Sequence, residues 1–263
     1  MTFDTDYPLS EAQIRQYRRD GFIQLPDVLA GDDLRRMRDT ICVAVTAESA
    51  GDSRPFRAKS VYEQLFIQKV NLWQRHPAVR EFVLSRRFGS IAARLMGASA
   101  RIWHDQALFK EPLKGKPTPW HQDTHYWPHR EKGLQTSIWI ALCDATIENG
   151  CMSFLPSTHE LEAVESVKLD DPQDLLTIAP QLRHARPVTV ELPAGSCTFH
   201  NGFTFHHAGA NRSNAMREAF AIIYMPDGTT YSGAQHVVTD GLNLDVGHKF
   251  DSDLFPLVAT WRS

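Results

Sequence analysis

A short stretch near the middle of the chain concentrates side chains that bind metals. Residues 119–129 read PWHQDTHYWPH and contain three histidines and one aspartate. Successive side chains of a β-strand point to opposite faces, so His121 and Asp123 would share one side of a strand. Imidazole nitrogens and carboxylate oxygens are both common metal ligands. The pair is therefore a candidate for two ligands of one metal ion.

A second histidine cluster further along the chain offers a third ligand. Residues 197–213 read CTFHNGFTFHHAGANRS and contain His200, His206 and His207. Two imidazoles and one carboxylate make the facial triad of non-haem Fe(II) oxygenases, which keeps positions open for a cosubstrate and oxygen. An HxD pair by itself is more often a surface or hydrogen-bonded pair. The residues alone leave open which of the three histidines would complete a site.

An arginine in an otherwise apolar pattern supports a bound anion. In the run REAFAIIYMP, Arg217 shares a strand face with Ala219, Ala221 and Ile223. An unpaired charge inside a β core is costly, so a guanidinium there needs an anion. Its planar fork suits a carboxylate held by two parallel hydrogen bonds. The anion is either an internal Glu or Asp, or a dicarboxylate cosubstrate whose other end chelates the metal.

Together these motifs resemble the phytanoyl-CoA dioxygenase family, whose members are Fe(II)- and 2-oxoglutarate-dependent oxygenases on a double-stranded β-helix. The resemblance extends from about Lys69 to Pro226 and is carried by HQDTHYWPH, Trp139, ENGCMSFLPSTH, FTFHHAGANRS and Arg217. The helical beginning followed by GFIQLPDVL also matches. Each motif alone is weak, whereas the combination is specific.

The resemblance implies roles for individual residues. It makes His121, Asp123 and His206 the iron ligands, which are also the catalytic centre, and it gives Arg217 the far carboxylate of 2-oxoglutarate. Some relatives have a serine two residues after the distal histidine, where this chain has Ala208, so one contact with the cosubstrate is expected to be missing. Three further residues fall at positions associated with the cosubstrate pocket, the last two in looser flanking sequence: Trp139, Gln106 and Lys69.

The reaction implied by the resemblance consumes 2-oxoglutarate and O2, releases succinate and CO2, and hydroxylates an unactivated carbon of a small-molecule metabolite. Desaturation, epoxidation or ring closure with the same cofactors is the alternative outcome. A β-helix protein that binds a metal without redox chemistry is the alternative from another class. A carboxylate at Asp123, where halogenating relatives have a small residue, predicts oxygen transfer and not halogenation. His125, Tyr126 and His129 either begin the substrate-cavity wall or orient the metal ligands from behind, and His125 and His129 could also simply pack or be exposed.

The composition limits the classes of partner. The chain has 263 residues, 42% of them hydrophobic, and a formal charge of −3 without long Lys/Arg runs, so we expect no nucleic-acid partner. No stretch approaches the roughly 20 apolar residues of a membrane span. No signal peptide is recognisable, and the four cysteines form no CxxC, so we expect buried, reduced thiols in a cytoplasmic protein. We expect a small-molecule substrate and a protein that is a monomer or a homodimer.

The hydrophobic pattern changes once along the chain. Residues 1–100 are mainly helical in pattern, with helices expected over 11–20, 31–48 and 76–97 and a short strand over 21–25. From 101 to 226, short β-branched and aromatic runs separated by Gly, Pro and Asn predict an antiparallel sandwich or barrel. The charged insert 157–187 is expected to act as a lid. We expect one domain over 1–263, mainly β with flanking helices, on a jelly-roll, cupin-like core.

Overall fold

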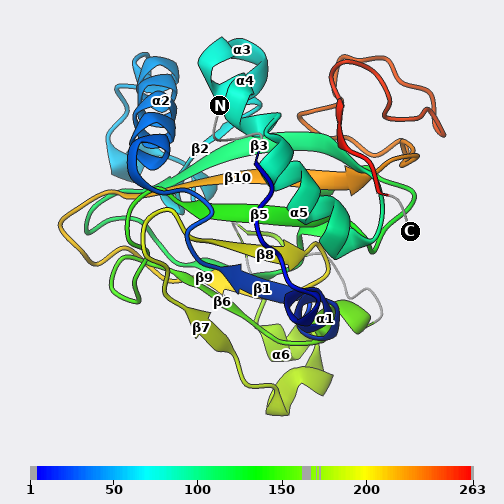
Figure 1. The fold of residues 1–263 in the computed structure, drawn as a ribbon. Helices are drawn as coiled ribbons and strands as arrows, with labels where there is room; N and C mark the ends of the chain where they lie inside the picture. The colour runs from blue at the N-terminus through cyan, green and yellow to red at the C-terminus, as the bar shows by residue number, and fades with distance from the viewer. Residues whose placement is uncertain (1–4, 162–166, 170, 172, 262–263) are drawn as a thin grey trace.

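Two antiparallel sheets form the framework in the computed structural model, which describes residues 5–161, 167–169, 171 and 173–261. The larger sheet has the strand order β1-β8-β5-β10-β3-β11, and β2 also pairs with β3. The smaller sheet has the order β4-β9-β6-β7 (Figure 1). The strands of the larger sheet are β1 Phe22–Leu25, β2 Ile67–Val70, β3 Ala100–Lys110, β5 Thr136–Ala141, β8 Cys197–Asn201, β10 Arg217–Pro226 and β11 Leu257–Ala259. Those of the smaller sheet are β4 Thr118–His121, β6 Met152–Phe154, β7 Val188–Val190 and β9 His206–Ala208.

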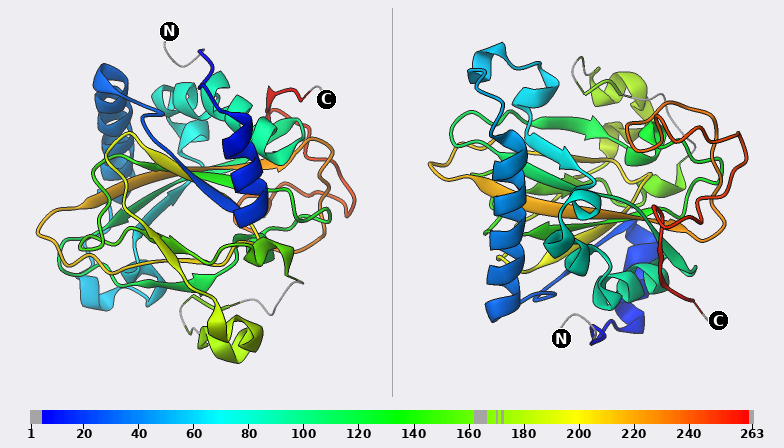
Figure 2. Two further views of the ribbon diagram at one scale, coloured as in Figure 1. Left: turned by 60° about the horizontal axis from the view of Figure 1, so that its bottom comes forward. Right: turned by 90° about the horizontal axis from the view of Figure 1, so that it is seen from above.

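Most of the helices lie against the larger sheet. In Figure 1 the helices α2 to α5 gather above and in front of that sheet, and β6, β7 and β9 lie below it. The helix α5 contacts β3, β5 and β10. Figure 2 turns the molecule so that the two sheets and the position of α2 beside the larger one can be followed. The helices are α1 Glu11–Asp20, α2 Gly31–Ser49, α3 Leu72–Arg75, α4 Pro77–Val83, α5 Arg86–Met96 and α6 Leu175–Ile178.

Local capping signals explain where the first helix begins and ends. The side chain of Ser10 accepts a hydrogen bond from the backbone N–H of Gln13, whose side chain bonds back to the N–H of Ser10, which is a capping box. Gly21 ends α1 at φ 77°, a left-handed conformation that costs glycine little. The expected helix over 11–20 is confirmed.

The expected single helix over 76–97 is wrong, because the chain forms two helices there. The helix α4 ends at Val83, and the side chain of Ser85 then accepts a hydrogen bond from the N–H of Phe88 to begin α5. Serine competes for backbone hydrogen bonds and so favours helix starts over helix interiors. Because of the break, α5 is a separate helix that packs against the larger sheet. It ends at Gly97, as expected.

The strand β10 divides the hydrophobic core into two layers. Phe220, Ile222 and Tyr224 pack in the cluster shared with the helices. Ala219, Ala221 and Ile223, one residue out of step, pack in the cluster between the sheets. This alternation is the period of a β-strand, and it places Arg217 on the inner face. The predicted jelly-roll fold class and the predicted face of Arg217 are both confirmed.

Strands outside the expected β region complete the larger sheet. The early strand β1 pairs with β8, as the expected strand over 21–25 allows. The strand β2 within the supposedly helical part pairs with β3, and β11 beyond Pro226 pairs with the same strand. The boundaries expected for the β region are therefore too narrow, because edge strands this short carry little pattern of their own.

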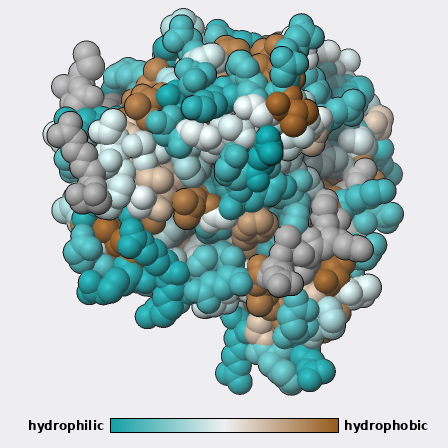
Figure 3. All heavy atoms as spheres, turned by 90° about the vertical axis from the view of Figure 1, so that its right-hand side faces the viewer, coloured by the Kyte–Doolittle hydropathy of each residue, from teal (hydrophilic) through white to brown (hydrophobic). Residues whose placement is uncertain are grey.

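The surface and the cysteines agree only in part with expectation. No helix among the described residues is long and apolar enough to cross a membrane. Figure 3 shows a mostly hydrophilic face on which apolar groups are separate and small. All four cysteines are free, but only Cys151 and Cys197 are buried, and Cys42 and Cys143 are half-buried.

Candidate active site

Three side chains from three backbone segments meet between the sheets. His121 is the last residue of β4, and Asp123 begins a single 3₁₀ turn, Asp123–Tyr126. His206 begins β9 and pairs with His121 across the smaller sheet. One ligand atom from each of the three residues lies within 4.8 Å of the others. The Asp123 Oδ1 atom is 3.4 Å from His121 Nε2 and 3.7 Å from His206 Nε2.

The way Asp123 reaches this cluster differs from expectation. The alternation argument assumed that His121 and Asp123 share one strand, but β4 ends at His121. The chain then turns, and this turn, not the pleat of a strand, brings the carboxylate back beside the imidazole. The expected proximity exists for a different geometric reason.

Backbone carbonyls fix the orientation of both imidazoles. His121 Nδ1 lies 2.8 Å from the carbonyl oxygen of Pro119, and His206 Nδ1 lies 2.9 Å from that of Thr204. Since a carbonyl only accepts, each Nδ1 carries the proton and donates it. Each Nε2 is left with a free lone pair on the side of Asp123. This second set of contacts is the usual way in which proteins orient metal-binding histidines.

The carboxylate is held in its ionised form. Burial would raise the pKa of Asp123, but the surrounding imidazoles, His206 first among them, outweigh burial and hold that pKa well below its usual value. Burial lowers the pKa of His206 well below 6.5, so its ring is neutral. A charged carboxylate and neutral imidazoles are the protonation states that a divalent metal requires. The donor set fits Fe(II).

The two other histidines of the second cluster take different positions. His200 Nε2 lies 3.3 Å from Asp123 Oδ2, the carboxylate oxygen that faces away from His121 and His206. His207 projects toward Trp120, with 4.2 Å between the ring centroids. Among the described residues, the group that can hold a metal is His121, Asp123 and His206. The structure thus brings together the three residues that the resemblance implied.

Arg217 is buried, and the part of the chain that the structure describes offers it no anion. Only 2% of the residue is exposed, and its Nε and Nη1 atoms have no hydrogen-bond partner among the described residues. Its guanidinium lies 5.1 Å from the ring centroid of Trp139. Burial lowers its pKa from 12.5 to about 10, so the group remains charged at neutral pH. Unpartnered buried donors of this kind fit a ligand carboxylate, and no internal salt bridge to Arg217 is found in the described part of the chain.

One cavity contains both the triad and the arginine. Its volume is about 460 Å³, and its walls include His121, Asp123, His206, Arg217, Trp139 and Gln106. Gln106 accepts a hydrogen bond of 2.6 Å from Gln68. Ala208 and its cross-strand partner Thr118 on β4 both line this cavity.

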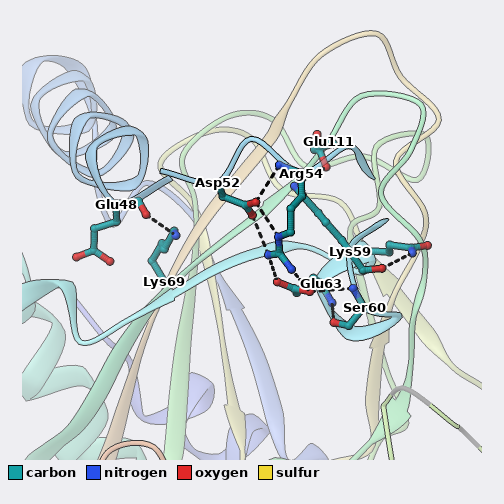
Figure 4. Close-up of polar contacts among 9 residues, drawn as sticks. Glu48, Asp52, Arg54, Lys59, Ser60, Glu63, Lys69 and Glu111 are labelled. Atoms are coloured by element: carbon teal, nitrogen blue, oxygen red, sulfur yellow. Dashed lines mark hydrogen bonds and ion pairs between the residues drawn. The ribbon is translucent and has the colours of Figure 1, made fainter. Parts of the chain in front are cut away.

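The expected place of Lys69 in the cosubstrate pocket is wrong. Figure 4 shows its side chain directed to α2, where Nζ donates to the carbonyl oxygen of Glu48 at 2.9 Å. Side chains alternate along β2, and it is the two neighbours, Gln68 and Val70, that line the cavity. Arg54, also in Figure 4, ties Asp52 to Glu63 and so holds the loop that precedes β2.

The histidines of the opening motif contribute less than their number suggests. His125 bonds to the side chain of Gln122 at 2.8 Å, and His129 packs on Trp103 with 4.5 Å between ring centroids. Neither lines the cavity, whereas Tyr126 does. Sequence reasoning missed the remaining walls. His104 and Leu108 carried a signal, because they share a strand face with Gln106; lining residues without one include Tyr62, Phe66, His236 and Val237.

The insert 157–187 supplies part of the wall. Lys168 and Leu169 line the cavity, and the hydroxyl of Tyr126 donates to the carbonyl oxygen of Val167 at 2.5 Å. Residues 162–166, 170 and 172 of the expected lid lie outside the described residues. These contacts place residues 167–169 of the insert beside the turn Asp123–Tyr126.

A buried His-Asp-His cluster and an unpartnered arginine inside a jelly roll define a class, the non-haem iron proteins that also bind a dicarboxylate. The sequence comparison agrees, because the family profile described as Phytanoyl-CoA dioxygenase (PhyH) matches residues 17–219. The chain belongs to the phytanoyl-CoA dioxygenase family. Its relatives include structures described as dependent on α-ketoglutarate, which is 2-oxoglutarate, and one of these contains Fe3+.

Curated relatives are between 22% and 30% identical to the chain over the aligned residues. A phytanoyl-CoA dioxygenase of Arabidopsis thaliana is 27% identical over 61% of this chain and 57% of its own length. An L-proline trans-4-hydroxylase of Streptomyces griseoviridis is 30% identical over 60% of this chain and 58% of its own length. These matches therefore span less than two thirds of either relative.

Solved structures match over nearly the whole chain. The carbocyclase SnoK from nogalamycin biosynthesis has a TM-score of 0.84 and 32% identity, covering 96% of this chain and 97% of its own. The epimerase SnoN, solved with Fe3+, α-ketoglutarate and nogalamycin RO, has a TM-score of 0.79 and 28% identity, covering 94% of this chain and 98% of its own.

Proposed function

We propose that the protein is a Fe(II)- and 2-oxoglutarate-dependent dioxygenase that hydroxylates an unactivated carbon of a free small-molecule metabolite, releasing succinate and CO2. One observation carries the proposal: the guanidinium of Arg217 has no anionic partner among the described residues and lines the same cavity as the triad. A protein that only bound a metal would have no use for a buried, unpartnered cation. The family match supports the same cofactors.

The residues of the site divide into three tasks. His121, Asp123 and His206 would hold the iron through the Nε2 and carboxylate atoms that already converge. Arg217 would bind the far carboxylate of 2-oxoglutarate, and Trp139 covers the guanidinium and keeps water from it. When bound, iron together with 2-oxoglutarate and O2 supplies an oxidant able to attack an unactivated C–H bond. The protein otherwise positions the reactants and excludes water.

The remaining walls favour an organic substrate with apolar surface. Tyr62, Phe66, Tyr126 and Trp127 present rings to the cavity, and Val237 stands 71% exposed at its edge. Aromatic and aliphatic walls with a few polar groups are typical of small-molecule sites. The similarity to SnoN, whose structure contains nogalamycin RO, supports a free metabolite and not a CoA thioester.

Ring closure with the same cofactors is the second candidate outcome. It is favoured by the similarity to SnoK, a carbocyclase that matches 96% of this chain at 32% identity. The triad does not distinguish the two reactions. The outcome depends on whether the substrate radical bonds to oxygen or to another atom of the same substrate. We place hydroxylation first because the curated relatives include an L-proline trans-4-hydroxylase.

Succinate formation tests the proposal. Purified protein is incubated with Fe(II), 2-oxoglutarate and O2 while a panel of metabolites with aromatic and saturated rings is screened for faster succinate release. A hydroxylated product gains one atom from labelled O2, whereas ring closure removes two hydrogens and adds no oxygen. The Arg217→Met variant is the matched control and should release little succinate at the same 2-oxoglutarate concentration. If Fe(II) binds but 2-oxoglutarate neither binds nor is consumed with any of the panel, the metal-binding alternative is correct.

A further inference from the structure

Two histidines that are not metal-ligand candidates share one wall of the cavity. His104 lies in β3, and His236 lies in the segment between β10 and β11. This segment is on the right in Figure 1, the side that Figure 3 turns toward the viewer. Their ring centroids are 5.8 Å apart. Trp103 packs on both rings, at 5.9 Å from His104 and 5.2 Å from His236. The shared tryptophan holds the two imidazoles in fixed relative positions.

The backbone assigns opposite tautomers to the two rings. The Nδ1 atom of His104 lies 3.2 Å from the carbonyl oxygen of Asp105, which can only accept, so this Nδ1 carries the proton. The Nδ1 atom of His236 accepts a hydrogen bond of 3.1 Å from the N–H of Val238, so it carries none. In the neutral rings, the Nε2 of His104 is therefore an acceptor and the Nε2 of His236 is a donor.

Both rings are neutral at physiological pH. Burial, and then the neighbouring His236, lowers the pKa of His104 to about 3. Burial lowers the pKa of His236 to about 4, against a smaller opposite effect of Asp240. No hydrogen bond to either Nε2 is found among the described residues, and neither atom is among the buried atoms that lack a partner. Both Nε2 atoms therefore keep some accessible surface, and both residues line the cavity.

We propose, on the basis of the proposed function, that His104 and His236 form a donor–acceptor pair that binds a hydroxyl group of a neutral, ring-containing substrate and so selects the carbon presented to the metal. A hydroxyl can donate to His104 and accept from His236 in the same position. A carboxylate or phosphate only accepts hydrogen bonds from the two rings, and the Nε2 of His104, itself an acceptor, would offer it no donor. Among the described lining residues, the cationic side chains are Arg217, which faces the cosubstrate, and the exposed Lys168.

Binding of matched probes tests this pair without turnover. The holoenzyme, loaded with Fe(II) and 2-oxoglutarate under anaerobic conditions, is titrated with α-naphthol, α-methylnaphthalene and α-naphthoate. These probes share a ring system and differ in carrying a hydroxyl, a methyl or a carboxylate. Binding is followed through the visible absorption of the metal–2-oxoglutarate complex and through tryptophan fluorescence.

The unmodified protein should bind the naphthol about 2- to 100-fold more tightly than the methyl analogue, the range of one to two neutral hydrogen bonds. His104→Phe and His236→Leu should each reduce this preference toward one while keeping the affinity for α-methylnaphthalene. His129→Phe is the matched control, because this histidine packs on the same Trp103 but does not line the cavity. The His129→Phe variant should prefer naphthol over the methyl analogue to the same extent as the unmodified protein.

Three results would overturn the pair. They are equal binding of naphthol and methyl analogue to the unmodified protein, a preference that survives both variants, and tightest binding of the naphthoate. Failure of every probe to bind would also refute it, because the cavity would then reject neutral hydroxylated rings. Thermal unfolding and 2-oxoglutarate binding of each variant exclude misfolding as the cause. If 2-oxoglutarate itself fails to bind the unmodified protein, the proposed function has failed instead.

Discussion

Replacing Arg217 by methionine should have opposite effects on cosubstrate binding and on the stability of the cosubstrate-free protein. Methionine keeps an unbranched side chain of similar shape and removes the charge. Loss of a desolvated, charge-assisted contact costs on the order of 2–5 kcal/mol, because the donors are buried and aligned. The dissociation constant for 2-oxoglutarate should therefore rise about 30-fold to several thousand-fold.

The stability effect follows from the same burial. In the absence of cosubstrate, the shift in the pKa of Arg217 from 12.5 to about 10 means that folding destabilises the charged form. The unfolded chain binds this proton more tightly, so the cost is present throughout neutral pH and disappears only as pH rises past 10 and toward 12.5. A shift of this size corresponds to about 3 kcal/mol. The variant should accordingly unfold at the same or a higher temperature than the unmodified protein.

Calorimetric titration and thermal unfolding, each with and without 2-oxoglutarate, measure both effects. The unmodified protein at a hundred times its dissociation constant gains about 2.7 kcal/mol from the ligand, and the variant at that concentration should gain less than about 1 kcal/mol. Arg38→Met serves as the control, since this arginine pairs with Glu218, the next residue along β10, outside the cavity. Unchanged affinity in Arg217→Met, or a large loss of stability without ligand, would mean that the guanidinium serves the fold.

Three further outcomes are expected. His206→Ala should lose Fe(II) while His207→Ala retains it in a direct iron assay, because only His206 belongs to the converging group; the reverse result would move the ligand assignment. Burial raises the pKa of the Asp105 carboxyl to about 7. Its contribution to stability is therefore complete below pH 3.8 and is lost as pH rises through 7. In denaturant titrations, Asp105→Asn should make the free energy of unfolding less dependent on pH over this window. In excess chloride, the unmodified protein should yield oxygenated and not chlorinated product by mass, since Asp123 occupies the position that a halide would need; chlorinated product would contradict this ligand set.

The features that sequence reasoning recovered are those set by local chemistry. The capping box at Ser10 and the left-handed Gly21 fix both ends of α1 within a few residues. The inner-face position of Arg217 follows from the two-residue period of a strand whose identity was clear from its apolar run. Such signals depend on neighbouring residues and not on distant parts of the chain, so tertiary packing does not change the local structure that they predict.

The errors occur where the outcome depends on tertiary pairing. The strand β2 is half-buried on both faces, so its pattern does not reveal which side chains point inward. A shift of one residue exchanges the two faces, and this is the difference between Lys69 and Gln68. The break before Ser85 was equally hidden, because a serine within an otherwise helical pattern does not by itself end a helix.

The division between predictable and unpredictable residues follows the construction of the site. His121 and His206 face each other because β4 pairs with β9, so the sheet register that defines the fold also places the metal ligands. The substrate walls come largely from segments outside this register: the loop with Tyr62, the insert with Leu169 and the C-terminal segment with His236. These segments can change without disturbing the pairing of β4 with β9. A family resemblance carried by the β core therefore indicates the iron chemistry, whereas the substrate must be inferred from the loops that fold over it.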